Sequence, residues 1–130
     1  MEANFYMGYE SKIYIVEKTN YSWNESDNKK FARVLAVFDM ACFRDLSDWF
    51  RNKPATEHYI YADNSDTQIV EDCYGDTLKE ASVKDVIEKL EKIIKSGENY
   101  RRIFPLLATL KTFDAQGDCW GNIAVLHYGH

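Results

Sequence analysis

The sequence predicts an α+β fold, a two-layer sandwich in which two main helices cover one face of a mostly antiparallel sheet of about five strands. Three observations predict it. Short segments rich in β-branched and aromatic residues stand near both ends of the chain. Two further such segments flank a cluster of turn-forming residues, which is typical of a hairpin. Apolar residues recur at helical spacing between this hairpin and the last strand.

Three strands are expected outside the hairpin. Residues 12–18 are dense in β-branched and aromatic side chains, which favour a strand. Residues 32–38 continue as an apolar run after Arg33, which favours a central strand covered on both faces. Residues 120–128 predict a last strand, and we expect it to pair beside an early one.

A polar loop is expected at residues 20–30, between the first two strands. It carries the aromatic residues Tyr21 and Trp23. They either fold back over the edge of the core or form a contact surface, since Trp and Tyr are common anchors of protein interfaces.

Residues 57–72 predict a β-hairpin whose tip is residues 63–66, where Asn, Asp and Ser favour a turn. Side chains alternate along a strand, so Tyr59 and Tyr61 should share one face and His58 and Ile60 the other. Five carboxylates gather at the tip and along the exit of the hairpin, with no Lys or Arg between the first and the last: Asp63, Asp66, Glu71, Asp72 and Asp76. They form either a solvated turn or an acidic patch that docks on a basic partner.

A short helix is expected at residues 45–51, because Leu46, Trp49 and Phe50 recur at spacings of three and one. Asp45 is its expected N-cap. A further helix is expected after Phe104, with Pro105 near its first position.

The clearest helix covers residues 82–96. Ser82 is its expected N-cap, and Asp85 stands at the capping-box position three residues on. Its apolar stripe consists of Val83, Val86, Ile87, Leu90, Ile93 and Ile94. Acid-first ion pairs are expected on the opposite face, as in Glu91 with Lys95.

The whole chain is expected to be one domain, residues 1–130, with residues 1–6 a dispensable extension. Its net charge of −5 and its pI of about 5.2 argue against direct nucleic-acid binding and suit a basic partner. No apolar run approaches the ~20 residues of a membrane span, and the start lacks the pattern of a signal peptide. The three cysteines show no disulfide spacing. We therefore expect a cytoplasmic protein without a membrane partner.

No metal or cofactor is expected. The hairpin acids are dense enough to attract Mg²⁺ or Ca²⁺, but their spacing does not match an EF-hand loop. His58, His127 and His130 are too scattered for a zinc site. None of the six glycines belongs to a phosphate-binding motif.

Two other residue groups are expected to have no catalytic role. Cys42 and Cys73 stand near strand ends, where burial as small apolar side chains is expected. Arg101 and Arg102 either bind a phosphate, pair with the acidic hairpin or lie along the surface, and we favour the last two.

Three parts of the chain together resemble a known group of proteins: residues 7–14 (MGYESKIY), residues 59–63 (YIYAD) with 69–76 (IVEDCYGD), and residues 125–130 (VLHYGH). The chain resembles short, mostly uncharacterised proteins encoded by phages and prophages of Gram-positive bacteria. The resemblance runs from Met7 to His130 and carries over no catalytic residue. It implies an accessory factor, and some such proteins resemble anti-CRISPR or other anti-defence inhibitors. An acidic surface suits that role, because host nucleases hold nucleic acid in basic channels.

We therefore expect a non-enzymatic phage accessory protein that inhibits a host protein with a basic surface, such as a defence nuclease. The expected contact residues are the five hairpin carboxylates with Tyr21 and Trp23, and homo-oligomerisation stays open. Two alternatives remain. A small metal-dependent hydrolase would use the same carboxylates in a concave pocket. A nucleotide or signal-molecule binder would stack Tyr59, Tyr61 and Trp120 on a base.

Overall fold

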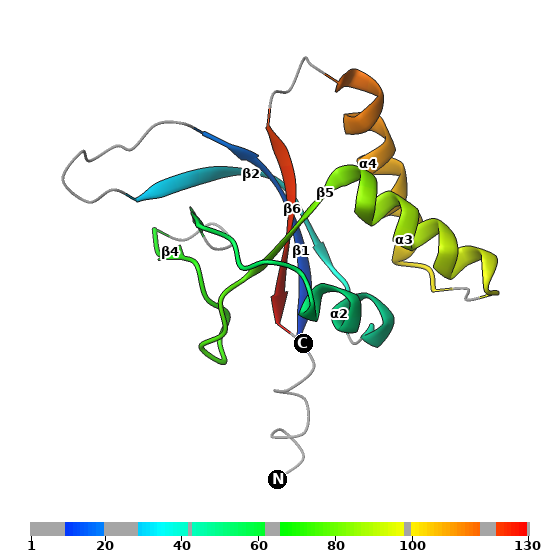
Figure 1. Cartoon of the computed structure of the whole chain (residues 1–130), viewed down its shortest axis with the longest axis horizontal. Helices are drawn as coiled ribbons and strands as arrows, with labels where there is room; N and C mark the ends of the chain where they lie inside the picture. The colour runs from blue at the N-terminus through cyan, green and yellow to red at the C-terminus, as the bar shows by residue number, and fades with distance from the viewer. Residues whose placement is uncertain are drawn as a thin grey trace, which may run out of the picture.

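The computed structural model describes residues 10–19, 29–41, 43–61, 66–97, 100–117 and 122–129, and every structural statement below concerns these. In chain order the elements are β1 (Ser11–Lys18), β2 (Lys30–Asp39), α2 (Arg44–Arg51), β3 (His58–Tyr61), β4 (Gln68–Ile69), β5 (Lys79–Ser82), α3 (Val83–Lys95), α4 (Ile103–Gln116) and β6 (Ile123–Gly129). The helices α3 and α4 lie side by side, and all three helices lie on the same side of the strands (Figure 1).

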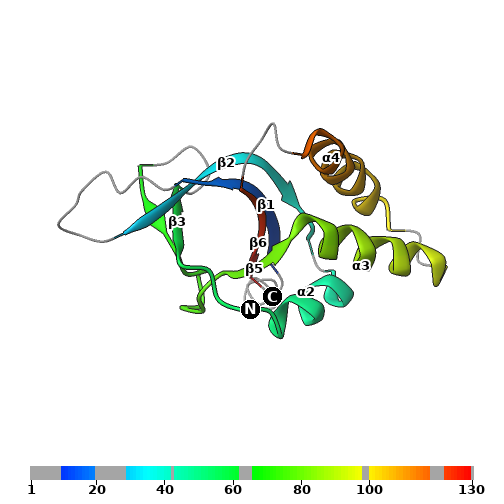
Figure 2. The same cartoon turned by 45° about the horizontal axis from the view of Figure 1, so that its top comes forward.

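Six strands form one sheet in the order β4-β3-β2-β1-β6-β5. Neighbouring strands are antiparallel except β2 and β3, which run parallel. The sheet curls strongly, and the helices lie outside the curl (Figure 2). Its two ends meet near β5, where the Leu78 amide donates to the Val70 carbonyl at 2.9 Å and the Thr56 amide donates to the Leu78 carbonyl at 2.8 Å.

Each face of the curled sheet buries its own apolar cluster, because successive side chains of a strand point to opposite faces. On β1, Ile13 and Ile15 pack against the helices, whereas Tyr14 and Val16 lie in the cluster inside the curl. All four side chains are buried. The strand β1 is therefore covered on both faces, and β6 beside it is buried along most of its length.

Two sequence predictions about α3 are confirmed and one is wrong. Ser82 caps the helix, with the Asp85 amide donating to its Oγ at 3.1 Å. The predicted stripe is buried from Val83 to Ile93, and Ile94 packs partly buried against the same cluster. The ion pair expected between Glu91 and Lys95 is replaced by one across helices, in which Lys111 of α4 lies 3.3 Å from Glu91.

The α+β class is confirmed, as are the hairpin of β3 with β4 and the position of the last strand beside an early one. The predicted sheet was wrong in detail, because it is mixed, curled and six-stranded. Its strand β5 was missed, since the sequence Lys-Glu-Ala-Ser has neither β-branched nor aromatic residues. The parallel pair arises because α2 carries the chain back across the sheet between β2 and β3.

Three local predictions were also wrong. The strand β2 is third in the sheet order, but only Ala32 is fully buried on it, because the curl leaves most of its length half covered. The helix α2 begins at Arg44 with Phe43 as N-cap, so Asp45 lies inside the first turn. The helix α4 begins at Ile103, and Pro105 occupies its third position. Proline is tolerated there because an amide proton in the first turn has no acceptor within the helix.

Candidate functional site

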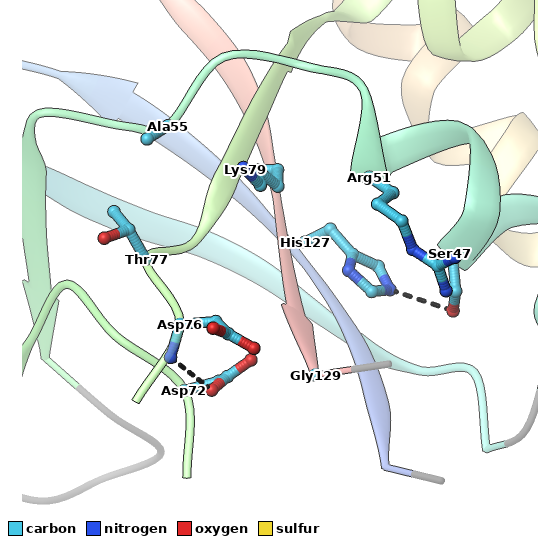
Figure 3. A pocket seen from close by; sticks show the side chains of 9 residues that line it. All are labelled: Ser47, Arg51, Ala55, Asp72, Asp76, Thr77, Lys79, His127 and Gly129. Carbon is cyan, nitrogen blue, oxygen red and sulfur yellow. Dashed lines mark hydrogen bonds between the residues drawn. The ribbon is translucent and has the colours of Figure 1, made fainter. Parts of the chain in front are cut away.

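A polar pocket of about 400 Å³ lies between α2, the loop before β5, and the sheet edge formed by β5 and β6 (Figure 3). Its size falls within the range of small-molecule sites. It is lined by Ser47, Arg51, Ala55, Asp72, Asp76, Thr77, Lys79, His127 and Gly129. The lining residues come from three stretches that are distant in sequence, residues 47–55, 72–79 and 127–129.

Regular secondary structure positions four of these side chains. Ser47 and Arg51 are four residues apart on α2 and so share one face of the helix. Lys79 and His127 are register partners on the antiparallel strands β5 and β6, and therefore stand side by side on the same face of the sheet. The helix α2 packs over the outer face of this strand pair (Figure 2).

His127 forms the floor of the pocket and is 4 % exposed. Its Nε2 lies 2.8 Å from Ser11 Oγ and 3.3 Å from Ser47 Oγ. Its ring stacks on Phe50 of α2, with centroids 5.0 Å apart and planes 17° apart. These contacts fix the ring in place and satisfy a buried polar nitrogen.

A serine hydroxyl beside an imidazole nitrogen is the arrangement of an activated nucleophile. Here the shorter contact goes to Ser11, which is fully buried and lies outside the pocket lining. Ser47, which does line the pocket, makes the longer one. The geometry thus favours a fixed polar wall over a catalytic pair.

The loop at residues 70–78 forms the opposite wall and is held by its own hydrogen bonds. Asp72 Oδ1 accepts from the amides of Tyr74 at 2.8 Å and Asp76 at 3.0 Å. The Asp72 amide donates to the Asp76 carbonyl at 2.8 Å. A β-bridge between Glu71 and Thr77 closes the base of the turn. These bonds form a turn around Gly75 that holds the Asp72 carboxylate in place, with Asp76 beside it on the pocket wall.

The predicted contact residues differ in their exposure and in their position relative to the pocket. Asp66, Glu71 and Asp76 are exposed and Asp72 is half-buried. The structure brings Asp72 and Asp76 together on the pocket wall. Asp63, Tyr21, Trp23 and Trp120 lie outside the described residues. Half-buried Tyr59 packs against Phe31, while Tyr61 is exposed.

The key residues Ser47, Lys79 and His127 were missed by sequence reasoning. His127 looked like one of three scattered histidines, and the strand of Lys79 was not foreseen. A signal for His127 did exist, because it stands inside an apolar strand at residues 123–129, where an isolated polar side chain needs a partner.

The expectation for one cysteine was wrong. Cys73 was expected to be buried but is exposed, with its Sγ 3.9 Å from Glu10 Oε2. Burial, together with the hydrogen bond that the Tyr128 hydroxyl donates to the Cys73 side chain, raises the pKa of Tyr128 to about 12. Arg102 is exposed and pairs with Asp39 at 3.6 Å, so of the two favoured alternatives the structure supports the one in which it lies along the surface. Cys42 and Cys119 lie outside the described residues.

The part of the chain that the structure describes contains no group of three or more His, Cys, Asp or Glu side chains placed to hold a metal ion. Within those same residues, no helix combines the length and the apolar character that crossing a bilayer requires.

Comparison with known proteins adds no relative: no protein-family model, no curated protein and no solved structure matches this chain.

Proposed function

We propose that this protein is a non-enzymatic binding protein that docks on a basic surface of a partner protein. Its docking surface is the acidic segment, defined as residues 66–76 with the carboxylates of Asp66, Glu71, Asp72 and Asp76. One observation carries the proposal: this segment contains four carboxylates and no Lys or Arg, and three of the four stand on a loop held by its own hydrogen bonds.

Pre-organisation supports docking over a merely solvated turn. Three of the carboxylates stand on the loop whose backbone is fixed by Asp72 and by the bridge between Glu71 and Thr77. A surface that is already ordered loses less conformational entropy when it binds. A negative patch also accelerates encounter with a positive one.

The class of partner follows from the charge and from the resemblance to phage proteins. A nuclease that holds nucleic acid in a basic channel presents the complementary surface. Carboxylates placed in that channel would compete with phosphates, and the protein would act as an inhibitor without chemistry of its own.

The test is a pull-down from host lysate with the wild-type protein and with the variant Asp66→Asn/Glu71→Gln/Asp76→Asn. Asp72 is kept, because its carboxylate holds the loop. The captured protein is identified and its affinity is measured at about 0.1 M and about 1 M salt, where the screening length falls from about 10 Å to about 3 Å. We expect the affinity for the wild type to fall steeply with salt, and the variant to lose the partner.

The matched control removes the same three charges from the helices, as Asp45→Asn/Glu88→Gln/Asp114→Asn. All three residues are exposed and lie outside the acidic segment. The control should retain the partner. If both triple variants lose the partner to the same extent, then net charge, and not this segment, determines binding.

A metal-dependent hydrolase is the second candidate, because Asp72 and Asp76 both line a concave pocket. It predicts a saturable rise in melting temperature with Mg²⁺ or Ca²⁺, since an ion that binds only the folded state stabilises it. The docking proposal predicts no such rise. A rise that disappears in Asp72→Asn/Asp76→Asn would favour the hydrolase.

A further inference from the structure

The charged side chains of the pocket are separated by sign. Lys79 and Arg51 stand with His127 and Ser47 toward one side, and Asp72 and Asp76 stand on the other (Figure 3). A purely anionic ligand would meet the two carboxylates, and a purely cationic one would meet the two cations. Only a ligand with both charges finds a partner on each side.

The two cations, Lys79 and Arg51, can still bind a negatively charged group of a ligand. Lys79 is half-buried and has no ion-pair partner among the described residues. Arg51 pairs with Asp48 at 3.0 Å, but both side chains are more than 60 % exposed, so the pair is weak. A guanidinium also has five N–H donors and can bind a second acceptor.

The Asp72 carboxylate can likewise accept a hydrogen bond from a ligand. Asp72 Oδ1 accepts the amides of Tyr74 and Asp76, whereas its Oδ2 makes no hydrogen bond to the described residues. The hydrogen bonds of the loop hold this oxygen in place beside the Asp76 carboxylate. A fixed carboxylate oxygen is a suitable acceptor for an ammonium group.

The volume limits the ligand. About 400 Å³ lies near the lower end of the ≈ 300–1,000 Å³ range of small-molecule sites, so the pocket suits a small ligand. Between the two charged sides, the Ser47 hydroxyl and Thr77 can form hydrogen bonds with an amide.

We propose that this pocket binds a small zwitterion of the size of a dipeptide. Its carboxylate lies between Lys79 and Arg51, and its ammonium group lies at Asp72 and Asp76. This goes beyond docking by the acidic segment. The two proposals share Asp72 and Asp76, but dipeptide binding needs no partner protein and Lys79 and Arg51 lie outside that segment, so either proposal can fail without the other.

The first experiment uses the wild-type protein and three probes that differ only at their ends: alanyl-alanine, its N-acetylated form and its C-terminal amide. Calorimetry should detect saturable binding of the free dipeptide with a Kd of about 1 mM or tighter. Each blocked form should bind at least about tenfold more weakly, because it loses a charge-assisted hydrogen bond. Inorganic phosphate, tested alone, should bind more weakly than the free dipeptide.

The second experiment compares Lys79→Met with Lys95→Met, which removes the same charge from an exposed position on α3. We expect Lys79→Met to weaken the binding of alanyl-alanine at least about tenfold and to reduce the penalty for amidation, with Arg51 retaining the rest. Lys95→Met should change neither. Asp72→Asn tests the other side, since an amide oxygen can still accept the two loop amides while the negative charge is lost. It should reduce the penalty for N-acetylation, with Asp76 retaining the rest.

Three results would overturn the proposal. One is equal affinity for the free and the blocked dipeptides. Another is phosphate binding as tight as dipeptide binding, which would make the pocket an anion site. The third is the absence of saturable dipeptide binding up to about 10 mM, well above the Kd expected here.

Discussion

Ser11 Oγ lies 2.8 Å from His127 Nε2, although 116 positions separate the two residues. The contact joins the first strand to the last and is completely buried. A slip of one residue between β1 and β6 would move His127 to the inner face of the sheet and leave the serine without this partner. The pair therefore helps to specify the register that places His127 and Lys79 under the pocket.

Removing the His127 ring should destabilise the fold. His127→Ala leaves a cavity against Phe50 and a buried serine without its partner, and we expect a loss of about 2–5 kcal/mol. His127→Phe keeps the ring stack and loses only the hydrogen bonds, for about 1–3 kcal/mol. Urea titration of both variants measures this. Losses below about 1 kcal/mol in both would mean that the contact is dispensable.

The buried stripe of α3 should account for much of the stability under the helices. Leu90 is fully buried, so Leu90→Ala should reduce the free energy of unfolding by about 2–5 kcal/mol. Lys92→Ala, on the exposed face of the same helix, should change it by no more than about 0.5 kcal/mol. Equal effects of the two substitutions in denaturant titrations would contradict the packing of α3 on the sheet.

Gly129 and Gly97 offer a matched pair of positive-φ glycines, at +94° and +97°. A Cβ at Gly97 would meet open space, so Gly97→Ala should cost only the backbone strain of about 1–2 kcal/mol. A Cβ at Gly129 would overlap the Glu10 carbonyl oxygen, so Gly129→Ala should cost clearly more and displace the end of β6. Thermal unfolding compares the two, and similar losses would show that the backbone at Glu10 yields easily.

His58 should make stability fall in mild acid. Burial lowers the pKa of its imidazole below the ordinary 6.5, and its buried Nδ1 has no partner among the described residues. The unfolded chain then binds the proton more readily than the folded one, so stability decreases as the pH falls below about 6.5 and levels off below the folded pKa. Nearby Glu80 opposes the shift, while Lys18 and Lys30 add to it.

The measurement for His58 is the melting temperature of the wild type and of His58→Gln between about pH 8 and about pH 5, on either side of the ordinary histidine pKa. The wild type should lose more stability than the variant across this range. Parallel curves would mean that His58 titrates alike in the folded and unfolded states.

Local features could be predicted from the sequence because their physical causes are local. Ser82 lies three residues before the amide that it caps, and the stripe of α3 repeats with the period of a helix. The antiparallel pairing of β3 with β4 likewise follows from the turn-forming residues that the sequence places between two short strand segments. The acidic segment could be recognised from composition alone, and its role stays a prediction.

By itself, the sequence determined the α+β class, the capped helix α3, the hairpin and the concentration of acid at residues 66–76. Only the tertiary structure decided how the sheet curls and which side chains meet at the pocket. Ser47, Lys79 and His127 come from α2, β5 and β6, and no short-range pattern connects them. Their proximity arises from long-range strand pairing, in which β6 lies between β1 and β5 and the ends of the curled sheet meet. Such pairing depends on contacts that form only when distant segments pack together.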